Sequence, residues 1–288
     1  LWALMEKRRF RELPALRDRL RVAAQWTAET FAEERRRFAV AYPEPVPILP
    51  PHRYRDVVVL PATGCPNHSC TFCDFYRDRP FVALDDAAFE AHLAEVIRLF
   101  GRALPQRGGV FLGSGSALSV SDRVLLRRLP RIMERVGPLQ RGIAAFHNPD
   151  LGKRRTVAQW QALRDAGLVD VTVGLETGLP RLREALHKSP DTARFATSVA
   201  DIKAAGIDVA VTVLLGVGAP ADAAAHRAAT AALIAEMPLD ARDRVYLSPL
   251  TEALSRTEAR AEMRRFRGAL RTDATVGAYL VERFAYFA

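Results

Sequence analysis

Hydrophobic and polar residues follow two different periods along most of this chain. From residue 56 onward, short runs of apolar and β-branched residues alternate with longer stretches in which apolar residues recur every three or four positions. The short runs predict strands and the longer stretches predict amphipathic helices. Six strands are expected, at 57–62, 109–113, 141–146, 169–174, 207–215 and 244–248. Helices are expected at 85–100, 121–136, 156–166, 179–187, 191–205 and 221–236, with a kink at Pro130.

This regular alternation predicts βα units that build a parallel sheet, which places the chain in the α/β class. Six units make an open, partial (β/α)6 barrel of the TIM-like type rather than a closed barrel of eight. In sheets of this kind, ligands lie at the carboxyl ends of the strands. The last residues of each strand are therefore the expected place for a functional site.

The regions on either side of this core have different patterns. Residues 1–42 predict helix, and the proline-rich stretch 43–51 ends it, because proline removes backbone donors and restricts its neighbours. We therefore predict a helical N-terminal extension with a proline-rich strap at 1–55, the (β/α)6 core at 56–250, and a C-terminal helix and aromatic tail packed on the core at 251–288. The extension could cap the barrel, shield a site or mediate dimerisation, and its residues do not choose among these.

Length and composition define the broad class of protein. The 288 residues suffice for one large α/β barrel or two small domains. No run approaches the ~18 consecutive apolar residues of a membrane span, and the first residues carry no signal-peptide pattern. The three cysteines are odd in number and clustered, which argues against a disulfide framework and for a reducing compartment. A cytoplasmic protein with no membrane partner is expected.

The formal charge of +9 comes overwhelmingly from arginine. Such a charge is compatible with attraction to nucleic acid, phosphate or carboxylate groups, and equally with a biased composition that spreads arginines over solvated helix faces. The arginines recur along the whole chain, which favours the second interpretation. Residues 252–271 predict a strongly basic helix, which is either a solvated outer helix at the sheet edge or a nucleic-acid contact.

All three cysteines lie in one loop directly after the first predicted strand. Cys65, Cys70 and Cys73 have the spacing C-x4-C-x2-C. Three thiols are too many for a lone nucleophile and one short of a tetrahedral zinc site, unless His68 or Asp74 completes it. Three thiolates can also hold three irons of a [4Fe-4S] cube and leave the fourth iron free to bind a ligand.

On this motif the chain resembles the radical S-adenosylmethionine (SAM) superfamily, and distantly its oxygen-independent coproporphyrinogen oxidase branch. The common family motif is C-x3-C-x2-C with an aromatic residue before the third cysteine, here Phe72. This chain has one extra residue between Cys65 and Cys70, so the subfamily stays unassigned. The resemblance implies that the cysteines, including Cys73, hold a single [4Fe-4S] cluster. It also implies that SAM is the second cofactor and chelates the free iron, with Phe72 nearby.

Three later strand ends fit the same resemblance. The second strand ends in Gly113-Ser114-Gly115-Ser116, where the family holds the amino group of SAM, and Ser114 or Ser116 would replace the usual glutamate. The fourth ends in Gly-Leu-Glu176-Thr-Gly with Lys188 following, which implies that Glu176 contacts the ribose or methionine part of SAM. The fifth ends in Gly-x-Gly, which implies a backbone edge beside the adenine. The residues concerned there are Val213, Leu215 and Gly216.

Two strand ends offer candidates for substrate contact, although no catalytic residue can be assigned. His147 and Asn148 follow the third strand, in a proline-linked turn that resembles a Glu-x-Asn-Pro motif with Phe146 at the acidic position. They could face the substrate, or they could cap the following turn. Tyr246 and Ser248 end the sixth strand and are also candidates.

The resemblance implies a radical SAM enzyme. In such enzymes the reduced cluster passes an electron to SAM, and a 5′-deoxyadenosyl radical abstracts hydrogen from the substrate. The many arginines favour an anionic small molecule, and the outcome could be rearrangement, oxidation, cyclisation or C–C bond formation. An electron donor such as flavodoxin or ferredoxin is expected. Because the chain has no fourth cysteine, a conventional auxiliary cluster is not expected.

Two other functions stay open on the same fold. One is a carrier protein for haem or an iron–sulfur cluster, which would hold the cluster without cleaving SAM. The other is a radical SAM enzyme that modifies RNA or nucleotides through the basic helix, although the chain has no recognisable RNA-binding module.

Overall fold

The computed structural model describes residues 14–46, 48–281 and 286, and the chain divides into two compact units, Leu1–Pro45 and Val46–Ala288. In the first unit, helices α3 (Pro14–Ala24) and α4 (Ala28–Ala41) replace the continuous helix expected there. The break occurs because Thr27 is extended and caps α4, its hydroxyl accepting from the Thr30 N–H in a capping box. The part of that prediction before residue 14 lies outside the described residues.

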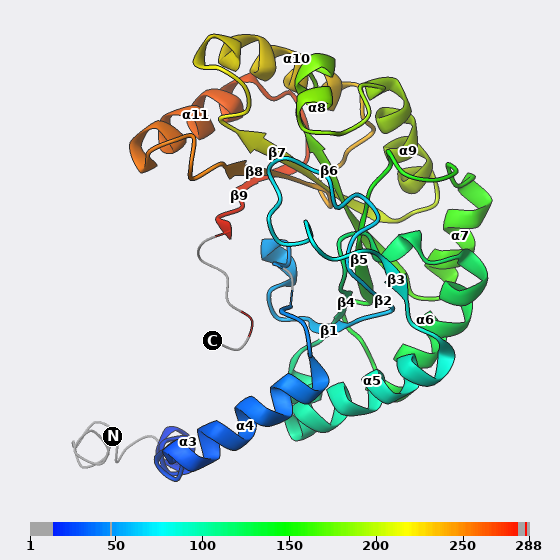
Figure 1. Ribbon diagram of the computed structural model, residues 1–288, viewed down its shortest axis with the longest axis vertical. Coiled ribbons are helices and arrows are strands. Elements are labelled where there is room, and N and C mark those ends of the chain that lie inside the picture. Colours follow the sequence, from blue (N-terminus) through cyan, green and yellow to red (C-terminus); the bar gives the residue numbers. More distant parts are fainter. Residues whose placement is uncertain (1–13, 47, 282–285, 287–288) are drawn as a thin grey trace. The chain divides into compact units, whose positions relative to one another are not determined.

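The second unit is built on one parallel sheet of seven strands with helices along its outer side (Figure 1). The strand order is β1-β4-β5-β6-β7-β8-β9, and each neighbouring pair is parallel. The strands are β1 (Val57–Val59), β4 (Val110–Leu112), β5 (Ile143–His147), β6 (Leu168–Glu176), β7 (Asp208–Leu215), β8 (Arg244–Pro249) and β9 (Thr275–Ala278). The α-helices of this unit are α5 (Asp86–Phe100), α6 (Asp122–Val136), α7 (Val157–Asp165), α8 (Pro180–Ala185), α9 (Thr192–Ala204), α10 (Ala223–Ala235) and α11 (Arg256–Ala269). Four short 3-10 helices are η1 (Pro51–Arg53), η2 (Gly101–Gln106), η3 (Ala117–Ser119) and η4 (Pro220–Asp222).

The prediction of an α/β partial barrel is confirmed. All six expected strands are present, and β1 and β9 are the two edges of the sheet, so the barrel is open. The seventh strand, β9, was not predicted, and α6 continues through Pro130. No helix in the described part of the chain is both long and apolar enough to cross a membrane.

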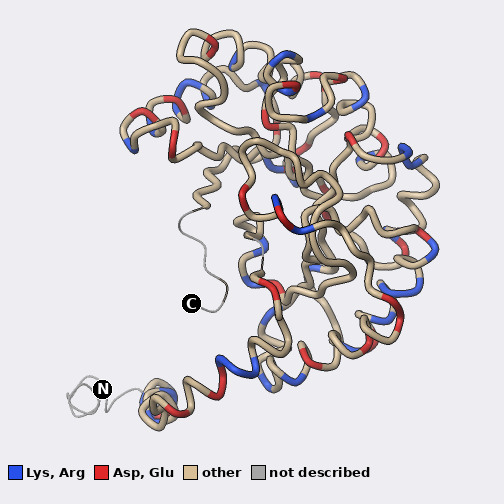
Figure 2. The backbone as a smooth tube through the Cα atoms, in the orientation of Figure 1, with Lys and Arg blue, Asp and Glu red and all other residues tan. Residues whose placement is uncertain are grey.

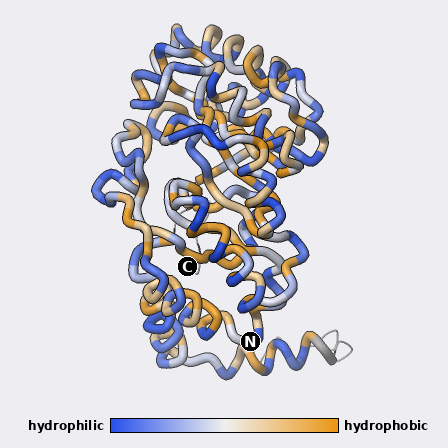
Figure 3. Tube along the Cα trace, turned by 90° about the vertical axis from the view of Figure 1, so that its right-hand side faces the viewer, coloured by the Kyte–Doolittle hydropathy of each residue, from blue (hydrophilic) through white to orange (hydrophobic). Residues whose placement is uncertain are grey.

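The core lies between the sheet and its helices. The central strands are almost entirely buried, as expected for a parallel sheet covered by helices, and hydrophobic residues gather along them (Figure 3). Charged residues of both signs are interleaved along the helices (Figure 2). Many arginines pair with carboxylates there, as Arg131 does with Glu90.

A buried polar cluster lies near the amino ends of the strands, and we call it the floor cluster. His52 contacts the Tyr246 hydroxyl through Nδ1 at 2.9 Å and the Asp170 carboxylate through Nε2 at 2.9 Å. Arg53 pairs with Asp170 at 3.2 Å and with Asp56 at 3.3 Å. Arg141 is the second partner of Asp56. The floor cluster therefore ties η1 to β6, to β8 and to the residue before β1.

Candidate functional site

The three cysteines lie in a compact loop closed by a small hairpin. Strand β2 (Ala62–Thr63) pairs antiparallel with β3 (Val82–Ala83), and the Cys65 N–H donates to the Arg79 carbonyl at 3.1 Å. Gly64 has a φ of +68°, and a Cβ on it would lie 2.1 Å from the Pro80 carbonyl oxygen. Only glycine allows two backbone segments to approach so closely, so Gly64 permits the two ends of the cysteine loop to lie side by side.

This cysteine loop docks on the segment that follows β6. The Thr71 hydroxyl donates to the Ala185 carbonyl at 3.2 Å, and His187 Nδ1 donates to the Ser69 carbonyl at 2.8 Å. Phe72 packs against an apolar cluster consisting of Leu182, Leu186, Leu214 and Val217. The loop therefore reaches from the end of β1 to the carboxyl ends of β6 and β7.

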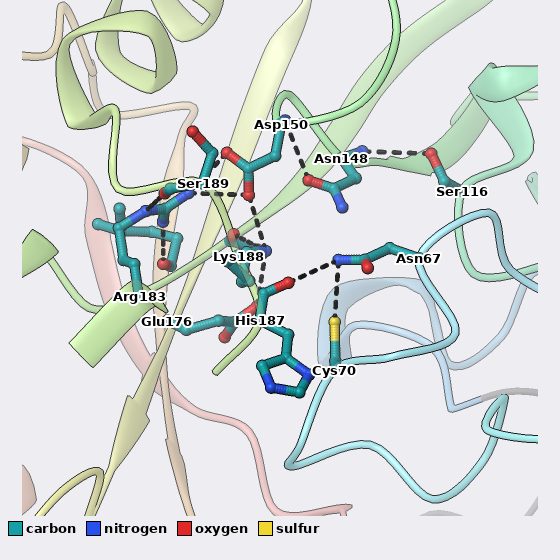
Figure 4. Close-up of polar contacts among 12 residues, drawn as sticks. Asn67, Cys70, Ser116, Asn148, Asp150, Glu176, Arg183, His187, Lys188 and Ser189 are labelled. Atoms are coloured by element: carbon teal, nitrogen blue, oxygen red, sulfur yellow. Dashed lines mark hydrogen bonds and ion pairs between the residues drawn. The ribbon is translucent and has the colours of Figure 1, made fainter. Parts of the chain in front are cut away.

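Asn67 makes a further contact between the same two regions. Its amide nitrogen lies 3.1 Å from Cys70 Sγ and 3.4 Å from the His187 carbonyl oxygen (Figure 4). The side chain thus touches both a predicted cluster ligand and the residue next to Lys188.

The glycine- and serine-rich turn after β4 lies directly against the cysteine loop. A Cβ on Gly115 would lie 2.6 Å from Cys65 Sγ, and one on Gly113 would lie 2.4 Å from Leu60. Ser114 has a φ of +91°, and its buried hydroxyl has no hydrogen-bond partner among the residues that the structure describes. The Ser116 hydroxyl, in contrast, accepts from the Asn148 N–H at 3.2 Å and from the Ser119 hydroxyl at 3.1 Å. Of these two hydroxyls, that of Ser114 is the one whose hydrogen-bonding capacity is left unused within the described part of the chain.

Glu176 ends β6 in a buried network of four charges (Figure 4). The Lys188 ammonium lies 3.7 Å from Glu176 and 3.6 Å from Asp150, and it donates to the Gly174 carbonyl at 2.7 Å. Arg183, whose side chain is fully buried, binds both oxygens of Asp150 at 2.6 and 2.8 Å and donates to the Leu175 carbonyl at 2.6 Å. Two cations thus balance two carboxylates, and Arg183 grips the backbone immediately before Glu176.

Burial is the largest influence on the Glu176 carboxyl. It raises the pKa of Glu176, although the charges of Lys188 and Arg183 oppose the shift. The backbone at Glu176 has a φ of +64°, which is uncommon for a residue with a side chain. A buried carboxylate held in this way carries a cost that a bound ligand with hydrogen-bond donors would offset.

The end of β7 is held from the helix side. The side chains of Val213 and Leu215 are fully buried within the sheet. Gly216 directly follows the strand and has a φ of +83°. His226 donates from Nε2 to the Leu214 carbonyl at 2.9 Å and accepts at Nδ1 from the Thr177 hydroxyl at 2.8 Å. This buried histidine therefore joins the carboxyl ends of β6 and β7.

The thiol environment suits a cofactor that brings positive charge. Burial raises the pKa of Cys65, and it raises the pKa of Cys70 to about 11. Iron ions would stabilise the thiolates, which the apoprotein does not. No three side chains of His, Cys, Asp or Glu in the described ranges are grouped as ligands of a single metal ion. In a cube each thiolate binds its own iron, so the sulfurs need not meet at one point.

The substrate candidates lie in different places. His147 belongs to β5 and stacks edge-on against Trp160 of α7, so it faces the helix layer. Burial, and then the charge of Arg155, lowers the pKa of this histidine to about 3. Asn148 caps its own turn, because its side-chain oxygen accepts from the Asp150 N–H at 3.1 Å. Tyr246 is buried and bonded to His52 in the floor cluster, and Ser248 is buried near the end of β8.

Sequence reasoning missed four residues that organise this edge: Asn67, Asp150, Arg183 and His187. Asp150 directly follows the Asn-Pro turn, and Arg183 lies in the helix after Glu176. A signal for this pair existed, because a carboxylate and a lysine buried at strand ends require further charged partners. Asn67 gave no such signal, since its partner His187 is 120 residues away.

Comparison with known proteins bears on this arrangement. A family model described as the radical SAM superfamily matches residues 59–234. No curated protein matches the sequence. The solved structure of methylornithine synthase (PylB) matches with 14% identity and a TM-score of 0.52, over 88% of this chain and 79% of that one.

Two other solved structures give weaker matches. Coproporphyrinogen III oxidase (HemN) from Escherichia coli has 11% identity and a TM-score of 0.49, covering 81% of this chain and 52% of that one. The methyltransferase TsrM from Kitasatospora setae has 17% identity and a TM-score of 0.46, covering 67% of this chain and 35% of that one. This chain thus spans about a third of the length of TsrM.

Proposed function

The chain belongs to the radical SAM superfamily, and on that premise we propose that it cleaves SAM reductively at a [4Fe-4S] cluster held by Cys65, Cys70 and Cys73. The predictions of an enzyme and of its two cofactors, the cluster and SAM, are confirmed by the family. The reaction on the substrate and the ligand set are the parts that we propose. A carrier function without SAM cleavage is the outcome that the experiment below distinguishes.

One observation carries the proposal. The cysteine loop, the turn after β4 and the charged network after β6 meet at one edge of the sheet, although the sequence separates them by about 40 to 120 residues. Gly115 lies against Cys65, and the loop contacts Ala185 and His187 directly. Residues predicted for cluster binding and for SAM binding are therefore neighbours.

The chain's own side chains have distinct tasks in this proposal. When bound, the cluster and SAM supply the one-electron and radical chemistry, which belongs to the cofactors rather than to the protein. The three thiolates hold iron, and Phe72 with its apolar cluster excludes water from one side of the loop. The unpartnered Ser114 hydroxyl would accept a hydrogen bond from the amino group of SAM, and the Glu176 carboxylate would contact its ribose or methionine part. The backbone around Gly216 would lie beside the adenine.

The substrate that we propose is a small anionic molecule, and the electron donor is a small redox protein such as a flavodoxin or ferredoxin. The four charges around Glu176 cancel, so the preference for an anion comes from the net charge of +9 over the whole chain. Such a charge steers anions toward the protein without specifying one.

An anaerobic assay tests the proposed function. The protein is reconstituted with iron and sulfide, SAM and dithionite are added, and 5′-deoxyadenosine is measured by chromatography beside a Cys73→Ala variant. We expect 5′-deoxyadenosine from the unmutated protein alone. A stable cluster without 5′-deoxyadenosine, with candidate substrates present, would instead support a carrier of iron–sulfur clusters or haem. Zinc in place of iron would contradict the proposal.

A second candidate function is the modification of RNA or nucleotides, and one observation favours it. The side chains of four exposed arginines on α11 take part in no ion pair or hydrogen bond with any described residue, whereas many arginine side chains elsewhere are paired. They are Arg256, Arg260, Arg264 and Arg267, whose spacing places them along one stripe. Single-stranded RNA should then bind with a log–log salt slope near −0.7 for each phosphate neutralised. Lack of binding at low salt would remove this candidate.

A further inference from the structure

The spacer between Cys65 and Cys70 is one residue longer than in the common family motif, and its second residue is Asn67. Asn67 is partly buried, and its side chain points back to the loop that carries it (Figure 4). We propose that Asn67 tunes the cluster, because its amide N–H donates to Cys70 Sγ and thereby raises the cluster's reduction potential. This inference rests on the proposed function.

The orientation of the amide is fixed by its partners. A carbonyl oxygen can only accept, so the group that lies 3.4 Å from the His187 carbonyl must be the NH2 group. The amide oxygen accepts from the Ser69 hydroxyl at 3.0 Å on the opposite side. The nitrogen that faces Cys70 Sγ at 3.1 Å is therefore a donor, and the contact is an N–H···S hydrogen bond.

Both sides of this contact are anchored. The Ser69 carbonyl accepts from His187 Nδ1 at 2.8 Å, so the spacer and the turn at His187 bind each other in both directions. Thr71 and Phe72 hold the part of the loop beyond Cys70 to Ala185 and the apolar cluster, whereas the amide itself is held by Ser69 and His187. The amide is thus held in place before a cluster is bound, and little reorganisation is needed for the bond to act.

The sign of the effect follows from electrostatics. Reduction adds one negative charge to the cluster, and part of that charge lies on the cysteine sulfurs. A donor directed at a sulfur stabilises the more negative state, and hydrogen bonds to the sulfurs are among the factors that determine cluster potentials. Removing the donor therefore lowers the reduction potential and makes the cluster harder to reduce.

The test is a redox titration of the reconstituted protein, monitored by the paramagnetic signal of the reduced cluster. Asn67→Ala should keep its iron and sulfide and show about a tenfold lower ratio of reduced to oxidised cluster at a fixed ambient potential, which is about 59 mV for one electron. Asn67→Asp should lower the ratio further, since it replaces the donor with a negative charge. Thr71→Val is the matched control. It removes a hydrogen bond to the same helix segment without touching a sulfur, and its potential should stay unchanged.

A second variant covers the case in which Asn67→Ala binds no cluster. Ser69→Ala removes only the hydrogen bond that orients the amide oxygen, and it should shift the potential in the same direction by a smaller amount. An iron-loaded Asn67→Ala protein with an unchanged potential would overturn the inference, as would an unchanged Ser69→Ala protein if Asn67→Ala loses its iron. If the unmutated protein binds no cluster, the proposed function fails instead. The two failures are therefore distinguishable.

Discussion

Two buried carboxylates at opposite ends of the partial barrel, Asp170 and Glu176, differ in how their charge is compensated, although burial raises the pKa of Asp56 in the floor cluster as it does that of Glu176. At the floor, burial pushes the pKa of Asp170 up, but the hydrogen bond from His52 and the charge of Arg53 outweigh it and hold the pKa below its usual range. At the carboxyl edge, burial also pushes the pKa of Glu176 up, and Lys188 and Arg183 do not outweigh it. The partners within the chain thus outweigh burial at Asp170 and do not outweigh it at Glu176.

The backbone shows the same contrast. Three non-glycine residues among those described have a left-handed φ: Ser114, Glu176 and His187. All three lie at the carboxyl edge around the cysteine loop, and the floor cluster contains none of them. Conformations of this kind cost roughly 1–3 kcal/mol each and tend to gather at functional sites. We therefore expect the floor cluster to contribute mainly to stability and the three residues with left-handed backbone to contribute to binding.

The largest expected effect concerns the ion pair of Arg183 with Asp150, because Arg183 contributes both to stability and to the position of Glu176. Arg183→Ala leaves Asp150 buried without its main partner, so the free energy of unfolding should fall by about 3–5 kcal/mol. SAM binding should also weaken, because Arg183 holds the Leu175 carbonyl before Glu176. Denaturant unfolding and SAM titration measure the two effects. Arg181→Ala, which removes an exposed arginine of the same helix, should alter neither by much.

A floor variant should affect stability alone. Asp170→Asn removes the charge opposite Arg53 and should lower the free energy of unfolding by about 2–3 kcal/mol. SAM cleavage per loaded cluster should stay the same in the folded protein. Tyr246→Phe loses only the hydroxyl bonded to His52 and should cost about 1 kcal/mol. A change in SAM affinity with Asp170→Asn would show that the two ends are not separate.

Glu176→Gln should weaken SAM binding and leave stability nearly unchanged, the reverse of what is expected for Asp170→Asn. The SAM dissociation constant should rise about tenfold, equivalent to about 1.4 kcal/mol, because the amide is a weaker acceptor than the carboxylate. The free energy of unfolding should change by less than about 1 kcal/mol, since removing a poorly compensated buried charge offsets the lost contact with Lys188. Unaltered SAM binding would exclude Glu176 from the site.

The cysteine thiols predict a pH dependence of the apoprotein. Burial raises the pKa values of Cys65 and Cys70 in the folded state, that of Cys70 to about 11, whereas in the unfolded chain a thiol has a pKa of about 8.5. A raised pKa gives stability below the unfolded value that is lost as pH rises toward the folded one. Between pH 8.5 and 11, the apoprotein should lose about 1 kcal/mol, discounted for the partial exposure of Cys70. A Cys70→Ala apoprotein, measured in parallel, should lose less over this range.

The smallest expected effect is on the free energy of unfolding of a Ser114 variant, which tests whether backbone strain at Ser114 accompanies SAM binding. Ser114→Gly relieves the left-handed φ of +91° and should raise the free energy of unfolding by about 0.5–1 kcal/mol. It should also weaken SAM binding, because the free hydroxyl is lost. Ser116→Gly, at a residue with a negative φ of −155°, should give no such stabilisation. A destabilised Ser114→Gly protein would argue against stored strain.

The fold could be predicted because its strands carry a strong local pattern. Strand β9 escaped prediction because Thr275–Ala278 is short, contains a glycine, and is defined by its pairing with β8 rather than by its own residues. His147 was expected beyond the end of its strand. The structure extends β5 by one residue, and the two-residue period of a strand then directs His147 to the helices.

The site could be predicted only in part. The cysteines and Glu176 could be proposed as site residues because thiols and a strand-end carboxylate indicate chemistry wherever they occur, and they stay a prediction. The contacts of Asn67 with His187 and of Asp150 with Arg183 depend on which loops meet in space, and local sequence does not encode this. Ser114 and Ser116 looked equivalent in sequence, and the structure separates them by their backbone φ and by the hydrogen bonds of Ser116.

The central claim is that the carboxyl edge binds a cluster and SAM together. The most direct measurement is the iron and sulfide content of the reconstituted protein, combined with the electron paramagnetic resonance spectrum of the reduced cluster before and after SAM is added. We predict about four irons per chain and a spectrum that SAM alters in the unmutated protein. A protein that takes up zinc instead, or a cluster whose spectrum does not respond to SAM, would contradict the account.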